Sequence, residues 1–121
     1  MRCTMTKRIL IIDDDPAMVD FLEEFFQDND YETAVAFNGH EGLEKAKAEK
    51  PDLVTLDMDM PKKGGTLFYA GLRRNPTLKD VPVIVISGVG PRPPSLTKDV
   101  PVLTKPVSND LLLEQVRTLL G

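Results

Sequence analysis

Cysteine is nearly absent from this sequence of 121 residues, and so are long apolar runs. The single cysteine, Cys3, excludes an internal disulfide bond. No apolar stretch is long enough to span a bilayer. Four apolar residues follow Lys7 and Arg8 before three aspartates begin, which is not the pattern of a signal peptide. We therefore expect a cytoplasmic location and no contact with a membrane.

Basic residues are also fewer than acidic residues. The 15 Lys and Arg residues are outnumbered by 19 Asp and Glu, and the net charge of -4 argues against direct nucleic-acid binding. The length favours one domain with an ordinary hydrophobic core. Residues 1–7 are expected to be a disordered or frayed N-terminal segment, and residues 8–121 the domain itself.

Short apolar runs alternate with helical patterns along the chain. Strands are predicted at about Arg8–Asp13, Glu32–Phe37, Asp52–Leu56, Pro82–Ile86 and Pro101–Thr104. Helices are predicted from Pro16 to about Asn29, with Met18, Phe21, Leu22, Phe25 and Phe26 as the apolar stripe, over Glu41–Glu49 and Thr66–Arg74, and after a cap at Ser108 or Asn109. Strands that are apolar throughout are buried on both faces, and strand–helix alternation makes the sheet parallel. The expected fold is a three-layer, doubly wound α/β domain with five strands.

The crossover between the fourth and fifth strands breaks this alternation. Gly88 to Val100 is only 13 residues long and contains Pro91, Pro93 and Pro94. Proline interrupts a helix because it lacks the N–H group and clashes with the preceding turn. The helix between strands four and five is therefore expected to be missing or reduced.

Groups with affinity for metals and phosphoryl groups follow four of the five predicted strands. They are the Asp13-Asp14-Asp15 run, Asp57, Ser87 and Lys105. Ligands bind at the carboxyl ends of the strands in open parallel sheets. These groups together predict a site for a divalent metal and a phosphoryl group.

The three consecutive aspartates exceed what a helix cap requires. Asp15 suits the N-cap and Pro16 the first helical position, so Asp13 and Asp14 are surplus. Adjacent carboxylates repel one another unless a cation neutralises them. Mg²⁺ commonly binds one or two carboxylates together with water and phosphate oxygens. We therefore expect Asp13 and Asp14 to bind Mg²⁺ or Mn²⁺.

Asp57 ends a buried strand, where its carboxylate either caps a turn or serves as a nucleophile beside the metal. A carboxylate can attack phosphorus to form an acyl phosphate. The loop that follows brings the backbone carbonyl of Asp59 within reach of the same metal. The ammonium of Lys105, which precedes Pro106, can act as a point charge on a phosphoryl oxygen, and Ser87 can donate a hydrogen bond to the same group.

In these features the chain resembles the response-regulator receiver domain of two-component signalling, over about residues 8–120. The resemblance is carried by the segments Ile9–Pro16, Pro51–Pro61, Val81–Gly88 and Leu103–Pro106. It implies a flavodoxin-like sheet of order 2-1-3-4-5. It also implies a phosphoacceptor regulator rather than an enzyme that turns over external substrates.

The resemblance assigns a role to each site residue. Asp57 would be the phosphoacceptor, charged from a phosphohistidine of a sensor histidine kinase or phosphotransfer protein. Asp13, Asp14 and Asp57 would hold Mg²⁺ together with the backbone carbonyl of Asp59.

The phosphoryl oxygens would be bound by residues from the last two strands. Ser87 would donate a hydrogen bond and Lys105 would form an ion pair, with Gly88 and Pro106 in support. Phosphorylation would shift the domain between two pre-existing states and so regulate a downstream effector protein or domain. The sequence names neither the kinase nor the output, and it leaves open a homodimer and a longer parent chain.

Three departures from the family pattern concern the output. Val102 stands where such receivers usually carry an aromatic switch residue, three positions before the lysine. The crossover helix, part of the usual output face, is expected to be missing or rudimentary. The segment Lys62–Gly65 lacks the family's common Asp and is expected to be a mobile loop, with a helix starting at Thr66.

The side chain of Asp59 has two interpretations. It is either a solvated loop carboxylate or a group that alters the phosphoryl lifetime, by repelling an incoming donor or by orienting water. The sequence leaves both open.

Two other functions compete with the receiver interpretation. Leu56-Asp57-Met58-Asp59 also matches the nucleophile motif of haloacid-dehalogenase-type phosphatases, although the acidic pair precedes the motif here rather than following it. The chain could also be a receiver-like interaction module that does not use phosphorylation, which Val102 and the proline-rich crossover favour.

Overall fold

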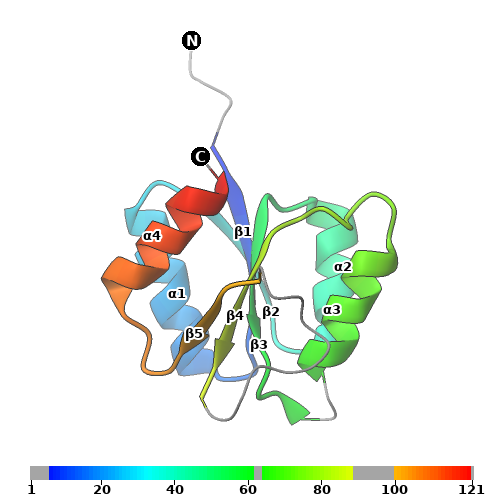
Figure 1. Ribbon diagram of the computed structural model, residues 1–121, viewed down its shortest axis with the longest axis horizontal. Helices are drawn as coiled ribbons and strands as arrows, with labels where there is room; N and C mark the ends of the chain where they lie inside the picture. Colours follow the sequence, from blue (N-terminus) through cyan, green and yellow to red (C-terminus); the bar gives the residue numbers. More distant parts are fainter. Residues whose placement is uncertain (1–5, 62–63, 89–99, 121) are drawn as a thin grey trace.

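The chain folds around one sheet of five parallel strands (Figure 1). The computed structural model describes residues 6–61, 64–88 and 100–120. The strands are β1 (Arg8–Ile12), β2 (Glu32–Ala36), β3 (Leu53–Asp57), β4 (Val83–Ser87) and β5 (Val102–Thr104). The helices are α1 (Pro16–Asp28), α2 (Gly39–Glu49), α3 (Gly64–Arg74) and α4 (Asn109–Leu120).

Helices cover both faces of the sheet. Figure 1 shows α1 and α4 on one side and α2 with α3 on the other. Successive residues of β1 enter opposite cores, because side chains alternate along a strand: Leu10 and Ile12 pack on the α2–α3 side, Ile9 and Ile11 on the α1–α4 side. The sheet is thus buried on both faces, which confirms the predicted three-layer α/β fold.

The strand order is β2-β1-β3-β4-β5, as the resemblance implied. The order reverses between β1 and β3, which pair in parallel with Ile12 opposite Leu56. Asp57 lies opposite Ile86, and Ser87 opposite Thr104. This register brings the residues that follow β1, β3, β4 and β5 to one edge of the sheet.

The apolar stripe of α1 differs in part from the prediction. Leu22 and Phe26 are buried as expected, but Val19 is buried as well and Phe21 is 37% exposed. The ring of Phe21 stacks instead on Phe25, with centroids 6.1 Å apart. Val19, Leu22 and Phe26 follow the three- and four-residue spacing of a buried face, and Phe21 lies at the edge of that face.

Two glycine-containing segments expected to precede helices are in fact their first turns. Helix α2 begins at Gly39 because Asn38 is its N-cap, with the Asn38 side chain accepting a hydrogen bond from the N–H of Glu41 at 2.8 Å. Helix α3 begins at Gly64 rather than at Thr66. A Cβ on Gly39 would collide with the carbonyl oxygen of Gly64, so these glycines permit close approach of two helices.

Several expectations fall outside the described residues. These concern the frayed segment over residues 1–5, the loop at residues 62–63 and the reduced crossover at residues 89–99. The last helix is capped by Ser108, whose Oγ accepts a hydrogen bond from the N–H of Leu111 at 3.3 Å. Among the described residues, no helix combines the length and the apolar character that crossing a membrane requires.

Substitution by alanine should have different effects on stability at the two glycines that begin α3. A Cβ on Gly65 would lie 2.7 Å from the carbonyl oxygen of Asp57 and 2.8 Å from Sδ of Met58, whereas a Cβ on Gly64 would meet nothing closer than 3.4 Å. Gly65→Ala should therefore lower the free energy of unfolding by about 1–3 kcal/mol through overpacking. The matched variant Gly64→Ala should be neutral or stabilising by up to about 1 kcal/mol, since alanine is the better helix former. Urea denaturation measures both, and equal effects of the two substitutions would contradict the close approach at Gly65.

Candidate functional site

Two buried aspartates form the floor of the predicted site. Asp13 follows β1 and is 1% exposed, and Asp57 ends β3 and is 2% exposed. The N–H of Asp13 donates to the carbonyl of Ala36, which continues the β1–β2 ladder and fixes the position of its side chain. Oδ1 of Asp13 accepts a hydrogen bond from the N–H of Asp15 at 2.9 Å. Oδ1 of Asp57 accepts one from the N–H of Asp59 at 2.9 Å.

Lys105 supplies an ammonium to this carboxylate cluster. Its backbone N–H donates to the carbonyl of Ser87 at 3.0 Å, which ties it to the end of β4. Its Nζ lies 3.4 Å from Oδ1 of Asp57 and 3.9 Å from Oδ2 of Asp13. Burial by itself lowers the pKa of Lys105, but the charges of Asp57, Asp13 and Asp59 outweigh it and raise that pKa above its usual value. The lysine is therefore held in its charged form beside Asp57.

Three carboxylates converge closely enough to bind one metal ion. One oxygen each from Asp13, Asp14 and Asp57 lies within 4.8 Å of the others. Oδ2 of Asp13 is buried without a hydrogen-bond partner among the described residues. A buried carboxylate oxygen in this state is costly unless a cation satisfies it. The donor set, all carboxylate oxygen, fits a hard divalent cation.

The pKa of Asp13 also indicates that the ionised form of this carboxyl group is disfavoured in the site. Burial, and to a lesser extent the neighbouring charge of Asp57, raise that pKa from 3.8 to about 6. The hydrogen bond from Asp15 and the charge of Lys105 act in the opposite direction but do not compensate. Without a cation, ionised Asp13 is therefore an unfavourable buried charge.

Asp59 lies at the exposed rim of the site, and its carboxylate has hydrogen-bond partners there. Its Oδ1 accepts a hydrogen bond from Oγ of Ser87 at 3.2 Å, and its Oδ2 accepts one from the N–H of Gly88 at 2.6 Å. The same Oδ2 lies 4.0 Å from Nζ of Lys105. The sequence indicated that Asp59 lies near the acceptor, but no pattern in it showed these partners.

The remaining predicted residues lie at or behind the site. Pro106 follows Lys105 through a cis peptide bond. Val102 is the first residue of β5 and lies opposite Val85 of β4. It is half-buried and packs against the core on the α2–α3 side. Its side chain is thus continuous with the hydrophobic core.

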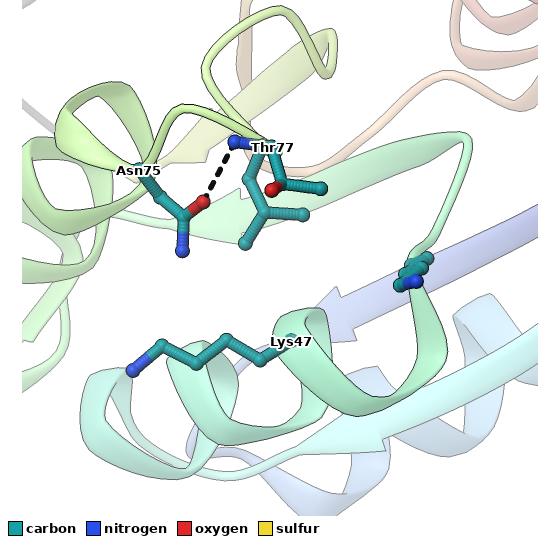
Figure 2. Close-up of a pocket in the computed structure, with 5 residues that line it drawn as sticks. Lys47, Asn75 and Thr77 are labelled. Carbon is teal, nitrogen blue, oxygen red and sulfur yellow. Dashed lines mark hydrogen bonds between the residues drawn. The ribbon is translucent and has the colours of Figure 1, made fainter.

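A hollow lies between α2 and the turn after α3, away from the carboxylate cluster (Figure 2). It is lined by Lys47, Lys50, Asn75, Thr77 and Leu78. Oδ1 of Asn75 accepts a hydrogen bond from the N–H of Thr77 at 2.8 Å, which closes the turn locally. None of the residues predicted for the site lines this hollow, so it is distinct from the carboxylate cluster.

Comparison with known proteins identifies the family. The chain matches the response regulator receiver domain over residues 9–117 and belongs to that family. It is 34% identical over 119 residues to the response regulator PleD of Caulobacter vibrioides, covering 95% of this chain and 26% of PleD. It is 30% identical over 112 residues to protein Rrf1 of Nitratidesulfovibrio vulgaris, covering 93% of this chain and 81% of Rrf1.

Solved structures agree with this assignment. The receiver domain of the Francisella response regulator 1452 superimposes with a TM-score of 0.81 at 30% identity, covering 95% of this chain and 97% of that one. Receiver domains of response regulators are signalling domains rather than classical enzymes, and they interact with histidine kinases and output domains. Membership of this family decides against the phosphatase alternative.

The raised pKa of Asp13 predicts how stability depends on pH without metal. At Asp13 the folded protein binds more protons than the unfolded chain between about pH 4 and pH 6, so the contribution of this group makes the folded state less stable as the pH rises through this range. Asp13→Asn keeps the acceptor for Asp15 but removes the charge. In EDTA it should be more stable than wild type at pH 7, by on the order of 2 kcal/mol.

The stability advantage of Asp13→Asn should shrink as the pH falls toward 4. Urea denaturation at pH 7 and at pH 4.5 measures it, with exposed Asp80→Asn as the control for net charge. If the difference in the free energy of unfolding between Asp13→Asn and wild type stays constant with pH, the claim that ionised Asp13 is an unfavourable buried charge would be contradicted.

Proposed function

We propose that this receiver domain accepts a phosphoryl group on Asp57 from a phosphohistidine of a sensor histidine kinase or phosphotransfer protein, in a reaction that depends on Mg²⁺ or Mn²⁺. The observation that carries the proposal is the buried carboxylate of Asp57, which lies between the acidic cluster of Asp13 and Asp14 and the ammonium of Lys105, 3.4 Å away. This combination supplies a nucleophile, cation ligands and a fixed positive charge at one edge of the sheet.

The transfer is a displacement at phosphorus. An oxygen of Asp57 forms the new P–O bond while the P–N bond to the donor imidazole breaks, and the imidazole leaves with the electron pair of that bond. Phosphoryl transfer proceeds through a loose transition state, so positioning and charge stabilisation supply most of the catalysis. The hydrogen bond from the N–H of Asp59 orients the carboxylate of Asp57.

The surrounding residues stabilise the charge on the phosphoryl oxygens. Asp13, Asp14 and Asp57, with the backbone carbonyl of Asp59, would hold Mg²⁺, and the ion would neutralise charge on nucleophile and phosphoryl group together. Lys105 would pair with one phosphoryl oxygen. Ser87 would donate a hydrogen bond to another, with Gly88 beside it at the end of β4 and Pro106 supporting Lys105.

The phosphorylated domain would act on a partner. Phosphorylation adds charge at the sheet edge and shifts the equilibrium between two states, which regulates a downstream effector protein or an attached output domain. We propose that this signalling takes place in the cytoplasm and that the chain, over residues 8–121, acts as a regulator and not as an enzyme with external substrates.

Intact mass spectrometry tests the acceptor directly. Incubation with Mg²⁺ and acetyl phosphate should add one phosphoryl group to the wild type, because Asp57 is positioned as the nucleophile. Asp57→Asn, which removes the nucleophile and keeps the shape of the side chain, should gain none, and neither should wild type in EDTA.

An absence of adduct has two explanations, which beryllofluoride binding separates. Binding in the presence of Mg²⁺ would indicate a working site with rapid loss of phosphate. No adduct and no beryllofluoride binding would reject the proposed acceptor and leave the interaction module that does not use phosphorylation.

A further inference from the structure

The carboxylate of Asp59 bridges donors from the end of β4. Oδ1 accepts from the hydroxyl of Ser87 at 3.2 Å, and Oδ2 accepts from the backbone N–H of Gly88 at 2.6 Å. Oδ2 also lies 4.0 Å from the ammonium of Lys105. One anionic group therefore engages a hydroxyl, a backbone amide and an ammonium at once.

These donors are the groups that a phosphoryl group on Asp57 requires. Phosphoryl oxygens are stabilised by an ammonium and by O–H and N–H donors. Asp59 is linked to Asp57 through its own N–H, and the two carboxylates share one ammonium, because Nζ of Lys105 lies 3.4 Å from Oδ1 of Asp57 and 4.0 Å from Oδ2 of Asp59. A carboxylate and a phosphoryl oxygen cannot both occupy the positions opposite Ser87 and Gly88.

The local geometry fits a carboxylate that is held but displaceable. Residue 88 lacks a side chain, and a Cβ there would lie 3.1 Å from Oδ2 of Asp59, so glycine lets the amide reach the carboxylate. The side chain of Asp59 is 35% exposed, whereas that of Asp57 is 2% exposed. Asp59 can therefore turn toward solvent without opening the core.

We propose that the carboxylate of Asp59 occupies the phosphoryl-binding donors of the unphosphorylated domain and is expelled when Asp57 is phosphorylated. The inference rests on the proposed function, because it takes Asp57 as the acceptor. Asp59 is an internal competitor of the phosphoryl group. Its expulsion breaks the side-chain link between the loop after β3 and the end of β4, while the backbone hydrogen bond from Met58 to Ile86 remains.

This exchange supplies a switch that needs no aromatic ring at Val102. Before phosphorylation, Asp59 connects the β3 loop to Ser87 and Gly88. After phosphorylation, those two donors turn to the phosphoryl oxygens, and a free carboxylate appears at the rim. Both the broken link and the released charge change the surface that a partner meets.

A titration with beryllofluoride, an analogue of the phosphoryl group on aspartate, tests the competition. It is performed at saturating Mg²⁺ on ¹⁵N-labelled wild type, Asp59→Ala, Asp59→Asn and the control Asp20→Asn, which removes the same charge from the exposed face of α1. Asp59→Ala should bind beryllofluoride about tenfold more tightly than wild type, which corresponds to about 1.4 kcal/mol. Asp59→Asn should gain less, because its amide oxygen still accepts from one donor. Asp20→Asn should stay within about twofold of wild type.

The amide proton of Gly88 reports the contact itself. In the free wild-type protein its hydrogen bond to a carboxylate should place it downfield, and Asp59→Ala should move it upfield. An unchanged Gly88 amide together with unchanged affinity in Asp59→Ala would overturn the inference and leave the proposed function standing. A gain in affinity that is equal for Ala and Asn and disappears in 1 M salt would also overturn it, because long-range repulsion would then be the cause. If none of the four proteins binds beryllofluoride, the proposed function fails and the competition fails with it.

Discussion

The burial of carboxylates at one edge of the sheet, and their repulsion for one another there, form the constraint on which the rest of this site depends. Asp13 and Asp57 are almost fully buried, and Asp14 lies within the same cluster. Lys105 contributes one ammonium, which does not prevent the pKa of Asp13 from rising to about 6. The sheet order makes this arrangement unavoidable, since β1 and β3 are neighbours and end at the same edge. A bound divalent cation would offset the repulsion, and so the folded domain is preorganised to bind one.

Much of the fold could be predicted because its physical signals are local. Apolar strands that alternate with helical patterns define a parallel sheet with two helical layers, and the groups that follow each strand must then meet at one edge. Asp13, Asp14, Asp57, Ser87 and Lys105 could be placed together on this ground alone. The errors arise where a residue's role depends on a distant neighbour. Gly64 and Gly65 signal a turn locally, yet they open α3 because its first turn packs against α2 and β3. The exposure of Phe21 is decided in the same way, by how α1 rotates on the sheet.

The partners of Asp59 could not be predicted from the sequence. A carboxylate two positions after Asp57 could point to solvent, to the metal site or across to β4, and only the register of β3 against β4 selects the last. The result is a side chain that uses the donors expected for the phosphoryl group. In the proposed function, the acceptor chemistry and its regulation would therefore depend on the same few atoms, in a domain whose fifth strand carries Val102 at the position where the family resemblance leads us to expect an aromatic switch residue.

Calorimetric titration with Mg²⁺ at pH 7 tests the central claim, that the carboxylate cluster is built for a cation. The informative pair of variants is Asp14→Asn and Asp15→Asn, which remove the same charge at adjacent positions. Asp15 caps α1 through the N–H of Ala17, and Asn caps a helix equally well. The account predicts that wild type and Asp15→Asn bind one Mg²⁺ ion with similar affinity, while Asp14→Asn binds it at least about tenfold more weakly. Equal binding by the two variants, or none by the wild type, would contradict it.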